Sequence, residues 1–298
     1  LAYNSLFKPF RFVVKYILAG VYPLFIRIYR LPSVASIEET IDKLIIDKCS
    51  ICRFGDGELL YISERRNLPF QKQNENLRQR FIEILKSREP KILIGLPIGF
   101  QSLKNLKKEV ALTWKAIIVW TYPGIRKFLD LQKKYYNSSM TRLYIGFIDT
   151  SKSKMLFEKF KSLWEDRDIL LVEGEKSRVG IGNDLFDNAR TIRRVLAPAH
   201  DAFDKYKEIL NEVYKYPSSN IVLISLGPTA KPLTYDLSKQ GYQVIDIGNL
   251  DIEYEWYKMG ASSIVRIKGK YTSEAKNGRE VEDILDDNYV NQIVSRIF

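Results

Sequence analysis

The segment Arg53-Phe-Gly-Asp56-Gly-Glu58 contains residue types that can bind a metal ion and a phosphate. Asp56 and Glu58 are separated by one glycine, so a flexible turn lets both carboxylates point at one divalent cation, which prefers oxygen ligands. The guanidinium of Arg53 is a planar fork that can hold a phosphate. We therefore expect a metal site at Asp56 and Glu58, with a phosphate contact at Arg53. The alternative is that the two acids only favour the dipole of the following helix.

A second segment, from Glu173 to Asp184, places Gly180 and Gly182 in a G-x-G arrangement beside Arg178 and Asn183. Such a turn suits a diphosphate, because backbone N–H groups and a guanidinium can both donate hydrogen bonds to it. The segment has neither the full dinucleotide-binding fingerprint nor the G-K-[ST] of a P-loop. We expect a loop that binds a diphosphate, with an ordinary surface loop as the alternative.

A third segment is the turn at Gly227 and Thr229, which follows an apolar run. Pro228 stands where the first residue of a helix is expected. A helix N-terminus at the end of a strand offers free backbone N–H groups to an anion. We expect Gly227 and Thr229 to contact a nucleotide, although a simple tight turn would look the same.

The fourth segment, DIGNLDIEYEW, begins at Asp246 and contains four carboxylates. Some of them can serve as charges at a helix N-terminus. Others can act as a general base that takes the proton of an acceptor hydroxyl. We expect Glu255 and Asp251 to be catalytic, and Asp246 and Asn249 to contact the bound substrate.

Short apolar runs alternate with helical patterns over most of the chain, which predicts an α/β fold: a Rossmann-like, largely parallel sheet flanked by helices. All four segments follow predicted strands, and ligands of such sheets bind beyond the carboxyl ends of the strands. The predicted strands are Ser50–Phe54, Lys91–Leu96, Ala116–Trp120, Arg142–Phe147, Asp168–Glu173, Ile192–Leu196, Asn220–Leu226 and Gln243–Ile247.

The first 33 residues are predicted to form a basic amphipathic helix and a linker, ahead of a domain spanning residues 34–298. Residues 1–30 hold five basic residues and no acidic one, and the longest uncharged run, Tyr16–Ile26, has 11 residues. A spanning helix needs about 20. A basic face opposite an apolar face, kinked near Gly20 and Pro23, predicts a helix on an anionic membrane surface. Packing on the domain, or a homo-oligomer, is the alternative.

The composition limits the classes of partner. The chain has 298 residues and a net charge of +11, which suits a phosphorylated or anionic partner. Nucleic acid is not expected, because no long basic stripe with interleaved aromatic residues occurs outside the N-terminal segment. Two cysteines exclude a disulfide scaffold, and a single histidine, His200, argues against a histidine-rich metal site.

Taken in order, the motifs RFGDGE, GEKSRVGIGNDLFDNA, SLGPTAKPLTYDL and DIGNLDIEYEWY resemble those of bacterial glycosyltransferases of the GT-D fold. The likeness covers about Ile37 to Lys268. The D-x-E metal motif of that family falls on Asp56 and Glu58. Its donor loop falls on Arg178, Gly180, Gly182 and Asn183. The family's last motif has a histidine where this chain has Asn249, whereas Glu255 keeps an acidic position.

The resemblance implies an enzyme that moves a hexose, glucose or a relative, from a UDP-sugar with the help of Mn²⁺ or Mg²⁺. The expected acceptor is a cell-surface glycan, glycolipid or glycoprotein, and the expected location is the cytoplasmic face of the membrane. The alternative, kept open by Asn249, is a non-catalytic subunit that binds a nucleotide-sugar or polyanion and partners another glycosyltransferase.

Overall fold

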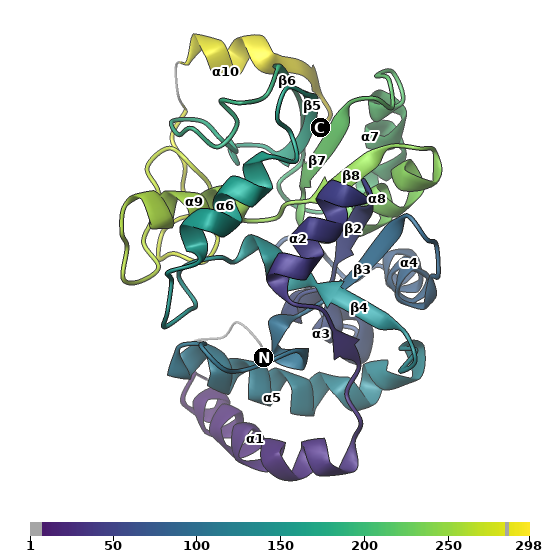
Figure 1. Ribbon diagram of the computed structural model, residues 1–298, viewed down its shortest axis with the longest axis vertical. Coiled ribbons are helices and arrows are strands. Elements are labelled where there is room, and N and C mark those ends of the chain that lie inside the picture. Colours follow the sequence, from purple (N-terminus) through teal and green to yellow (C-terminus); the bar gives the residue numbers. More distant parts are fainter. Residues whose placement is uncertain (1–7, 284–285) are drawn as a thin grey trace.

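The computed structural model describes residues 8–283 and 286–298. In these residues the strands form one nine-stranded sheet of order β1-β4-β3-β2-β8-β7-β5-β6-β9, and every pairing is parallel (Figure 1). The strands are β1 (Ser33–Val34), β2 (Ser50–Arg53), β3 (Ile92–Leu96), β4 (Lys134–Asn137), β5 (Asp168–Gly174), β6 (Thr191–Ala197), β7 (Ile221–Ser225), β8 (Gln243–Asp246) and β9 (Ile293–Arg296). The predicted α/β class is confirmed.

Helices cover both faces of the sheet. Figure 1 shows α2 and α6 crossing its front, whereas α8 contacts β2 and β8 from the other side. The helices are α1 (Lys8–Ile28), α2 (Ile37–Ile46), α3 (Asp56–Glu64), α4 (Glu75–Lys86), α5 (Lys108–Ile125), α6 (Ser153–Lys161), α7 (Tyr206–Val213), α8 (Ala230–Lys239), α9 (Leu250–Lys258) and α10 (Asp287–Gln292).

The strands are apolar on both sides because both faces of the sheet are buried. Successive side chains of a strand point to opposite faces. Leu171 therefore packs in the core under α2, α6 and α9, whereas its neighbour Leu170 packs in the core under α7 and α8. In the same way Ile51 faces the first core, and Cys52 joins the core of α3, α4 and α5.

The order in which the chain adds strands to the sheet changes direction between β2 and β8, although all strands remain parallel. From β2 the chain proceeds through β3 to β4 on one side, and β7, β5 and β6 lie on the other side. Such a switch point is where open parallel sheets open a crevice for ligands. Arg53, the last residue of β2, and Asp246, the last residue of β8, both lie there.

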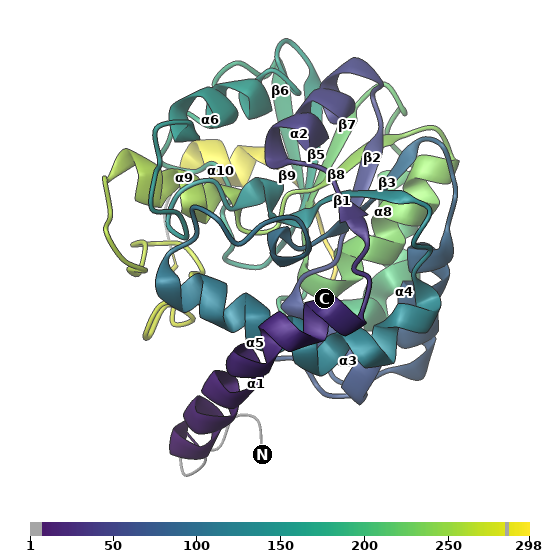
Figure 2. The same ribbon diagram turned by 60° about the horizontal axis from the view of Figure 1, so that its bottom comes forward.

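The N-terminal helix is present and packs on the outside of α5, remote from the sheet (Figure 2). The rings of Phe25 and Tyr122 meet edge to face at 6.1 Å. The helix is uninterrupted at Gly20 and Pro23 and runs from Lys8 to Ile28. Within the described residues no helix is both long and apolar enough to cross a bilayer.

Two predicted strands are wrong. Ala116–Trp120 lies inside α5, where Ile118, Tyr122 and Ile125 are buried at helical spacing. Arg142–Phe147 is a loop, because the Glu253 carboxylate accepts the backbone N–H groups of Tyr144 and Ile145, both at 3.1 Å. Conversely, the short strands β1, β4 and β9 were not predicted, since two to four residues give no detectable alternation.

Candidate active site

A buried cluster of two acids and two bases joins the ends of β2 and β8 to α3 and α8. The Lys231 ammonium lies 2.8 Å from Glu58 Oε1 and 3.3 Å from Asp246 Oδ2. Arg53 Nη2 lies 3.3 Å from Asp246 Oδ1. Burial disfavours the charged ammonium, but Asp246 and Glu58 outweigh that effect and raise the pKa of Lys231. The cluster is charge-balanced, so these four groups can stay ionised out of water.

Glu58 and Asp56 have different surroundings although they share one motif. Glu58 is buried, and its Oε2 accepts the backbone N–H of Gly55 at 2.8 Å, so it caps the start of α3. With Lys231 on Oε1, both oxygens are engaged. Asp56, the first residue of α3, is exposed at the surface, and no described side chain bonds or pairs with it. The protein atoms around the carboxyl, and next the charge of Glu58, raise the pKa of Asp56.

The residues present fit a divalent cation only if a substrate supplies part of its ligands. Among the residues that the structure describes, no three His, Cys, Asp or Glu side chains converge on one point. Mg²⁺ is commonly held by one or two carboxylates together with substrate phosphates, and it keeps several waters. Asp56 offers a carboxylate of that kind. Glu58 would join it only by giving up its contact with Lys231.

A glycine allows the β8 side of the site to approach Arg53 closely. Gly248 has φ +46°, and a Cβ there would lie 2.0 Å from Arg53 Nη2. The Gly248 carbonyl accepts the hydroxyl of Ser225, at the end of β7, at 2.9 Å. Any side chain at position 248 would therefore be strained in its backbone and would displace the Arg53 guanidinium.

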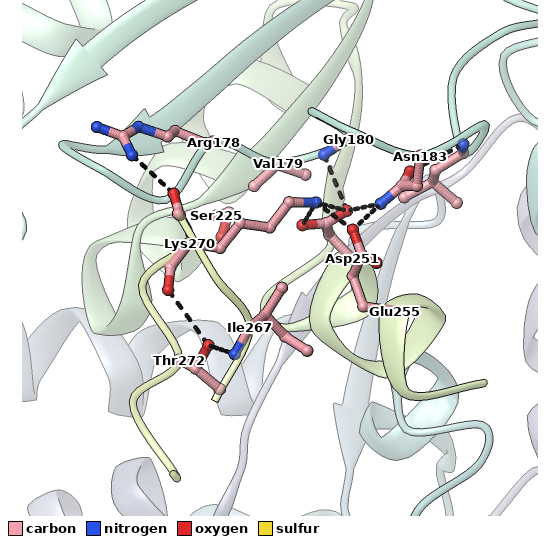
Figure 3. Close-up of polar contacts among 12 residues, drawn as sticks. Arg178, Val179, Gly180, Asn183, Ser225, Asp251, Glu255, Ile267, Lys270 and Thr272 are labelled. Atoms are coloured by element: carbon pink, nitrogen blue, oxygen red, sulfur yellow. Dashed lines mark hydrogen bonds and ion pairs between the residues drawn. The ribbon is translucent and has the colours of Figure 1, made fainter. Parts of the chain in front are cut away.

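A second polar cluster joins three segments around Asp251 (Figure 3). The Lys270 ammonium lies 2.7 Å from Asp251 Oδ2 and 2.8 Å from Glu255 Oε1. The amide of Asn183 donates to both carboxylates at 2.7 Å, and the backbone N–H of Gly180 donates to Asp251 at 2.9 Å. The predicted donor loop, α9 and the C-terminal segment are thereby tied together.

Asp251 is held by this second cluster although it also lines the neighbouring cleft. The residue is buried, and three donors bind it, two from the predicted donor loop and one from the C-terminal segment. Glu255 shares two of those donors. The two predicted catalytic carboxylates are close to each other and hold the site together in this conformation.

A cleft of ≈ 710 Å³, counting the space open to solvent, lies between the two clusters. Four predicted site residues line it: Gly227, Thr229, Asn249 and Asp251. Two cleft residues, Thr229 and Tyr271, have buried hydroxyl groups with no partner within the described part of the chain. Unpaired buried polar groups are costly, so these hydroxyls are candidates to bind a ligand.

The mouth of the site carries an ion-pair network that the sequence motifs did not include. Arg142 Nη1 donates to Glu274 at 3.0 Å, and the Asn249 amide donates to Glu274 at 3.1 Å. Arg142 also lies 3.5 Å from Glu253. Arg142 and Glu274 both contribute to the electrostatic potential at Asp56. The network therefore links the cleft to the candidate metal ligand.

Of the nine predicted donor-binding residues only Gly227, Thr229 and Asn249 line the cleft. Arg53, Gly180, Asn183 and Asp246 belong to the two polar clusters, whereas Arg178 and Gly182 belong to neither. Arg178 donates to the backbone carbonyl of Gly269 at 2.7 Å, and Figure 3 shows its guanidinium pointing away from the Lys270 cluster. Gly182 has φ +79° and no described contact in either cluster. By contrast Gly180 must be glycine, because a Cβ would lie 2.3 Å from the Phe186 ring.

Four charged residues of the site were missed from the sequence: Arg142, Lys231, Lys270 and Glu274. Lys231 lies within the quoted motif SLGPTAKPLTYDL, so its place after a strand was a usable signal. Lys270 and Glu274 lie in a polar tail with no regular pattern, and Arg142 lies in a segment mistaken for a strand.

The match to a family model decides the identity of this fold. The model described as Glycosyltransferase GT-D fold matches residues 51–275, which include both polar clusters and the cleft. The chain belongs to the GT-D fold glycosyltransferases. The resemblance of its four motifs to that family is confirmed, and α1 lies outside the matched region.

Relatives of this GT-D glycosyltransferase occur in streptococci. It is 40% identical over 266 residues to "Glycosyltransferase GlyD" of Streptococcus pneumoniae serotype 4, covering 89% of this chain and 32% of that protein. It is 37% identical to "Probable glycosyl transferase Gly" of Streptococcus gordonii, covering 89% of this chain and 39% of that protein. The chain thus spans 32% and 39% of the length of these two relatives.

Solved structures are similar over nearly their whole length. One, reported as having a distinct glycosyltransferase fold, superposes with a TM-score of 0.85 at 35% identity, covering 96% of this chain and 99% of the other. A glycosyltransferase from Streptococcus sanguinis superposes with a TM-score of 0.83 at 35% identity, covering 90% of this chain and 100% of the other. Both cover the GT-D domain.

Proposed function

We propose that this GT-D glycosyltransferase transfers a hexose, glucose, from a UDP-sugar to a hydroxyl of a cell-surface glycan carried on a lipid or a protein. The observation that carries the proposal is the cleft at the switch point of the sheet. It is lined by Gly227, Thr229 and Asn249, and the Asn249 amide donates to Glu274, which pairs with Arg142. Asp56 begins α3, which follows β2, so the candidate metal ligand lies at the same carboxyl edge of the parallel sheet as this cleft.

Binding of the donor is assigned to residues that present unused hydrogen-bonding groups. The hydroxyls of Thr229 and Tyr271 would bind polar atoms of the nucleotide. Arg142 is the cation at the mouth, and its present partner Glu274 is partly exposed, so a diphosphate can compete for the guanidinium. Arg53 would act indirectly, by holding Asp246, which in turn pairs with Lys231.

Metal binding is assigned to Asp56, backed by Glu58. A bound divalent cation would neutralise charge that develops on the departing diphosphate. Asp56 offers its carboxylate at the first residue of α3, and Glu58 fixes that turn by capping it. Lys231 stabilises Glu58 and so keeps the turn in place whether or not a cation is bound.

Transfer to an acceptor hydroxyl requires a base that takes its proton, and Asp251 and Glu255 are the candidates. One observation about these two carboxylates favours a second candidate function. Asp251 and Glu255 are both paired with Lys270. If that pairing persists when donor binds, neither carboxylate is free, and the chain would be a non-catalytic nucleotide-sugar-binding partner of another glycosyltransferase. In the leading proposal, donor binding at Arg142 releases Glu274 and loosens the segment that carries Lys270.

Turnover of a panel of nucleotide-sugars tests the proposal. The purified chain is incubated with each donor, with Mn²⁺, Mg²⁺ or EDTA, and with or without a panel of soluble glycoside acceptors, and released UDP is measured. We expect acceptor-dependent release from UDP-glucose that requires metal. Release independent of acceptor would indicate a hydrolase, and tight UDP binding without any release would favour the non-catalytic partner.

A further inference from the structure

The helix α1 buries only one side against the rest of the molecule. Ala19 and Phe25 are buried where α1 packs along α5, and Lys15 pairs with Glu109 of α5 at 3.6 Å. The opposite side of α1 exposes large apolar side chains, which we call the outer face: Phe12, Val13, Tyr16, Ile17, Val21, Leu24 and Ile28.

The outer face is a continuous stripe, not a set of isolated residues. Its members recur every three or four positions, so they stand one above another along the helix. Ile17 and Leu24 are each 60% exposed, and Ile28 is 68% exposed. Single exposed apolar residues are normal on a protein surface, whereas a contiguous apolar stripe marks a surface that something covers.

Basic groups border the stripe near its C-terminal end. Arg27 and Arg30 of the N-terminal segment are exposed, as are Arg126 and Lys127 just beyond α5. The Arg126 guanidinium lies 5.6 Å from the centre of the Tyr29 ring, which places the end of α5 beside the end of α1. The first 30 residues contain no acid, and the exposed Glu109 near the other end is paired with Lys15.

We propose that the outer face of α1 docks on an anionic lipid surface, with the helix lying in the plane of the interface. An apolar face bordered by Arg and Lys, on a helix without acids, is complementary to a bilayer whose headgroups are negative. A neutral protein partner would leave the four basic groups without counter-charges. This docking is separate from the donor site, because no residue of the outer face lines the cleft or belongs to either polar cluster.

Docking by α1 would hold the donor site near the membrane. The helix α5 contacts α3, and α3 begins at Asp56, so only α5 and α3 separate the outer face from the candidate metal ligand. A glycan carried on a lipid would then meet the enzyme at the same surface. The substrate class and the docking surface are consistent with each other.

The test is co-sedimentation of the full chain with vesicles of phosphatidylcholine alone, or of phosphatidylcholine with about 30% of the anionic lipid phosphatidylglycerol, which gives the surface a negative potential that attracts basic residues. We expect strong binding to the anionic vesicles only, weakened in high salt. Ile17→Glu with Val21→Glu should lower the partition coefficient at least about tenfold, and Arg27→Glu with Arg30→Glu about tenfold. Ile46→Glu is the matched control, because Ile46 is 76% exposed on α2 and lies outside the outer face.

Equal binding by wild type and the Ile17→Glu, Val21→Glu variant would overturn the proposal. So would a wild-type dimer in solution that the same two substitutions convert to a monomer without change in vesicle binding, since a second copy would then cover the face. UDP release with a soluble acceptor should be unchanged in all three variants, so failure of docking and failure of the donor site give different results.

Discussion

Individual residues of the D-x-E motif have separable tasks in this structure. Asp56 is exposed and has no charged partner among the described residues, whereas Glu58 is buried between Lys231 and the N-terminus of α3. The sequence pattern treats the two carboxylates as equivalent. Their environments make Asp56 the readily available ligand and Glu58 a residue that positions the turn. Substitutions at the two positions should therefore differ in their effect on stability.

Replacing Glu58 by Gln is expected to lower the free energy of unfolding by about 3 kcal/mol, because the buried Lys231 loses one of its two counter-charges. Replacing Asp56 by Asn should change it by less than about 0.5 kcal/mol, as for most exposed positions. Urea unfolding of both variants provides the measurement. Equal losses of stability would contradict the distinction between the two carboxylates.

Lys270 is expected to be the cation on which the second cluster depends. Lys270→Met leaves Asp251 and Glu255 adjacent without a counter-charge, which should cost about 3–5 kcal/mol. Adding Asp251→Asn to Lys270→Met should recover part of that loss, since it removes one of the two facing charges. A double-mutant cycle in thermal unfolding measures the coupling, and additive losses would show that the pairs do not interact.

At the scale of elements, most of the α/β pattern was predictable from the sequence. The loop at Arg142 and the segment that carries Lys270 and Glu274, which hold the site together through ion pairs, were not. The strand Asp168–Gly174 could be predicted from its apolar run, because a strand that is covered on both faces has apolar side chains pointing to both sides. The run inside α5 was mistaken for a strand because short apolar runs fit either period. The loop at Arg142 depends on Glu253, which is distant in sequence, so no local pattern could reveal it.

The packing of α9 against the donor loop should be sensitive to acid through Asp184. Burial alone would raise the pKa of Asp184, but hydrogen bonds from Lys258 and Tyr254 lower it to about 2. Because this folded-state pKa lies below the ordinary value, the ionised carboxylate stabilises the fold above about pH 4, and the contribution is lost as the pH falls toward 2. Asp184→Asn should therefore destabilise the protein at pH 6 and progressively less as the pH falls from 4 to 2.

Unfolding curves of wild type and Asp184→Asn at several pH values between 2 and 6 check this expectation. The matched substitution Asp287→Asn, on the exposed start of α10, should show no such pH dependence. A gap between wild type and Asp184→Asn that stays constant across the range would mean that Asp184 stabilises α9 by packing alone.

At the scale of the whole molecule, the fold brings motifs from distant parts of the sequence to one edge of a parallel sheet. Arg53 and Asp246 are neighbours only because β2 and β8 pair at the switch point. The resemblance to the family predicted that the four motifs form one site, and the alternation of strands and helices predicted the parallel sheet. Lys231 had a usable signal in its place after a strand, although the sequence does not name the acids it pairs with. The role of Lys270 could not be predicted, because a lysine in a polar tail carries no sign of the acid it will meet.

The central claim is that the cleft binds a nucleoside diphosphate with a cation at Asp56. Calorimetric titration of UDP into the purified chain, with Mn²⁺ or with EDTA, tests it most directly. We expect binding that requires Mn²⁺ and weakens about ten- to hundredfold in Asp56→Asn, the loss that follows from one charge-assisted contact of about 1.5–3 kcal/mol, with Asp287→Asn unchanged. Absence of UDP binding, or equal affinity in Asp56→Asn and wild type, would contradict the account.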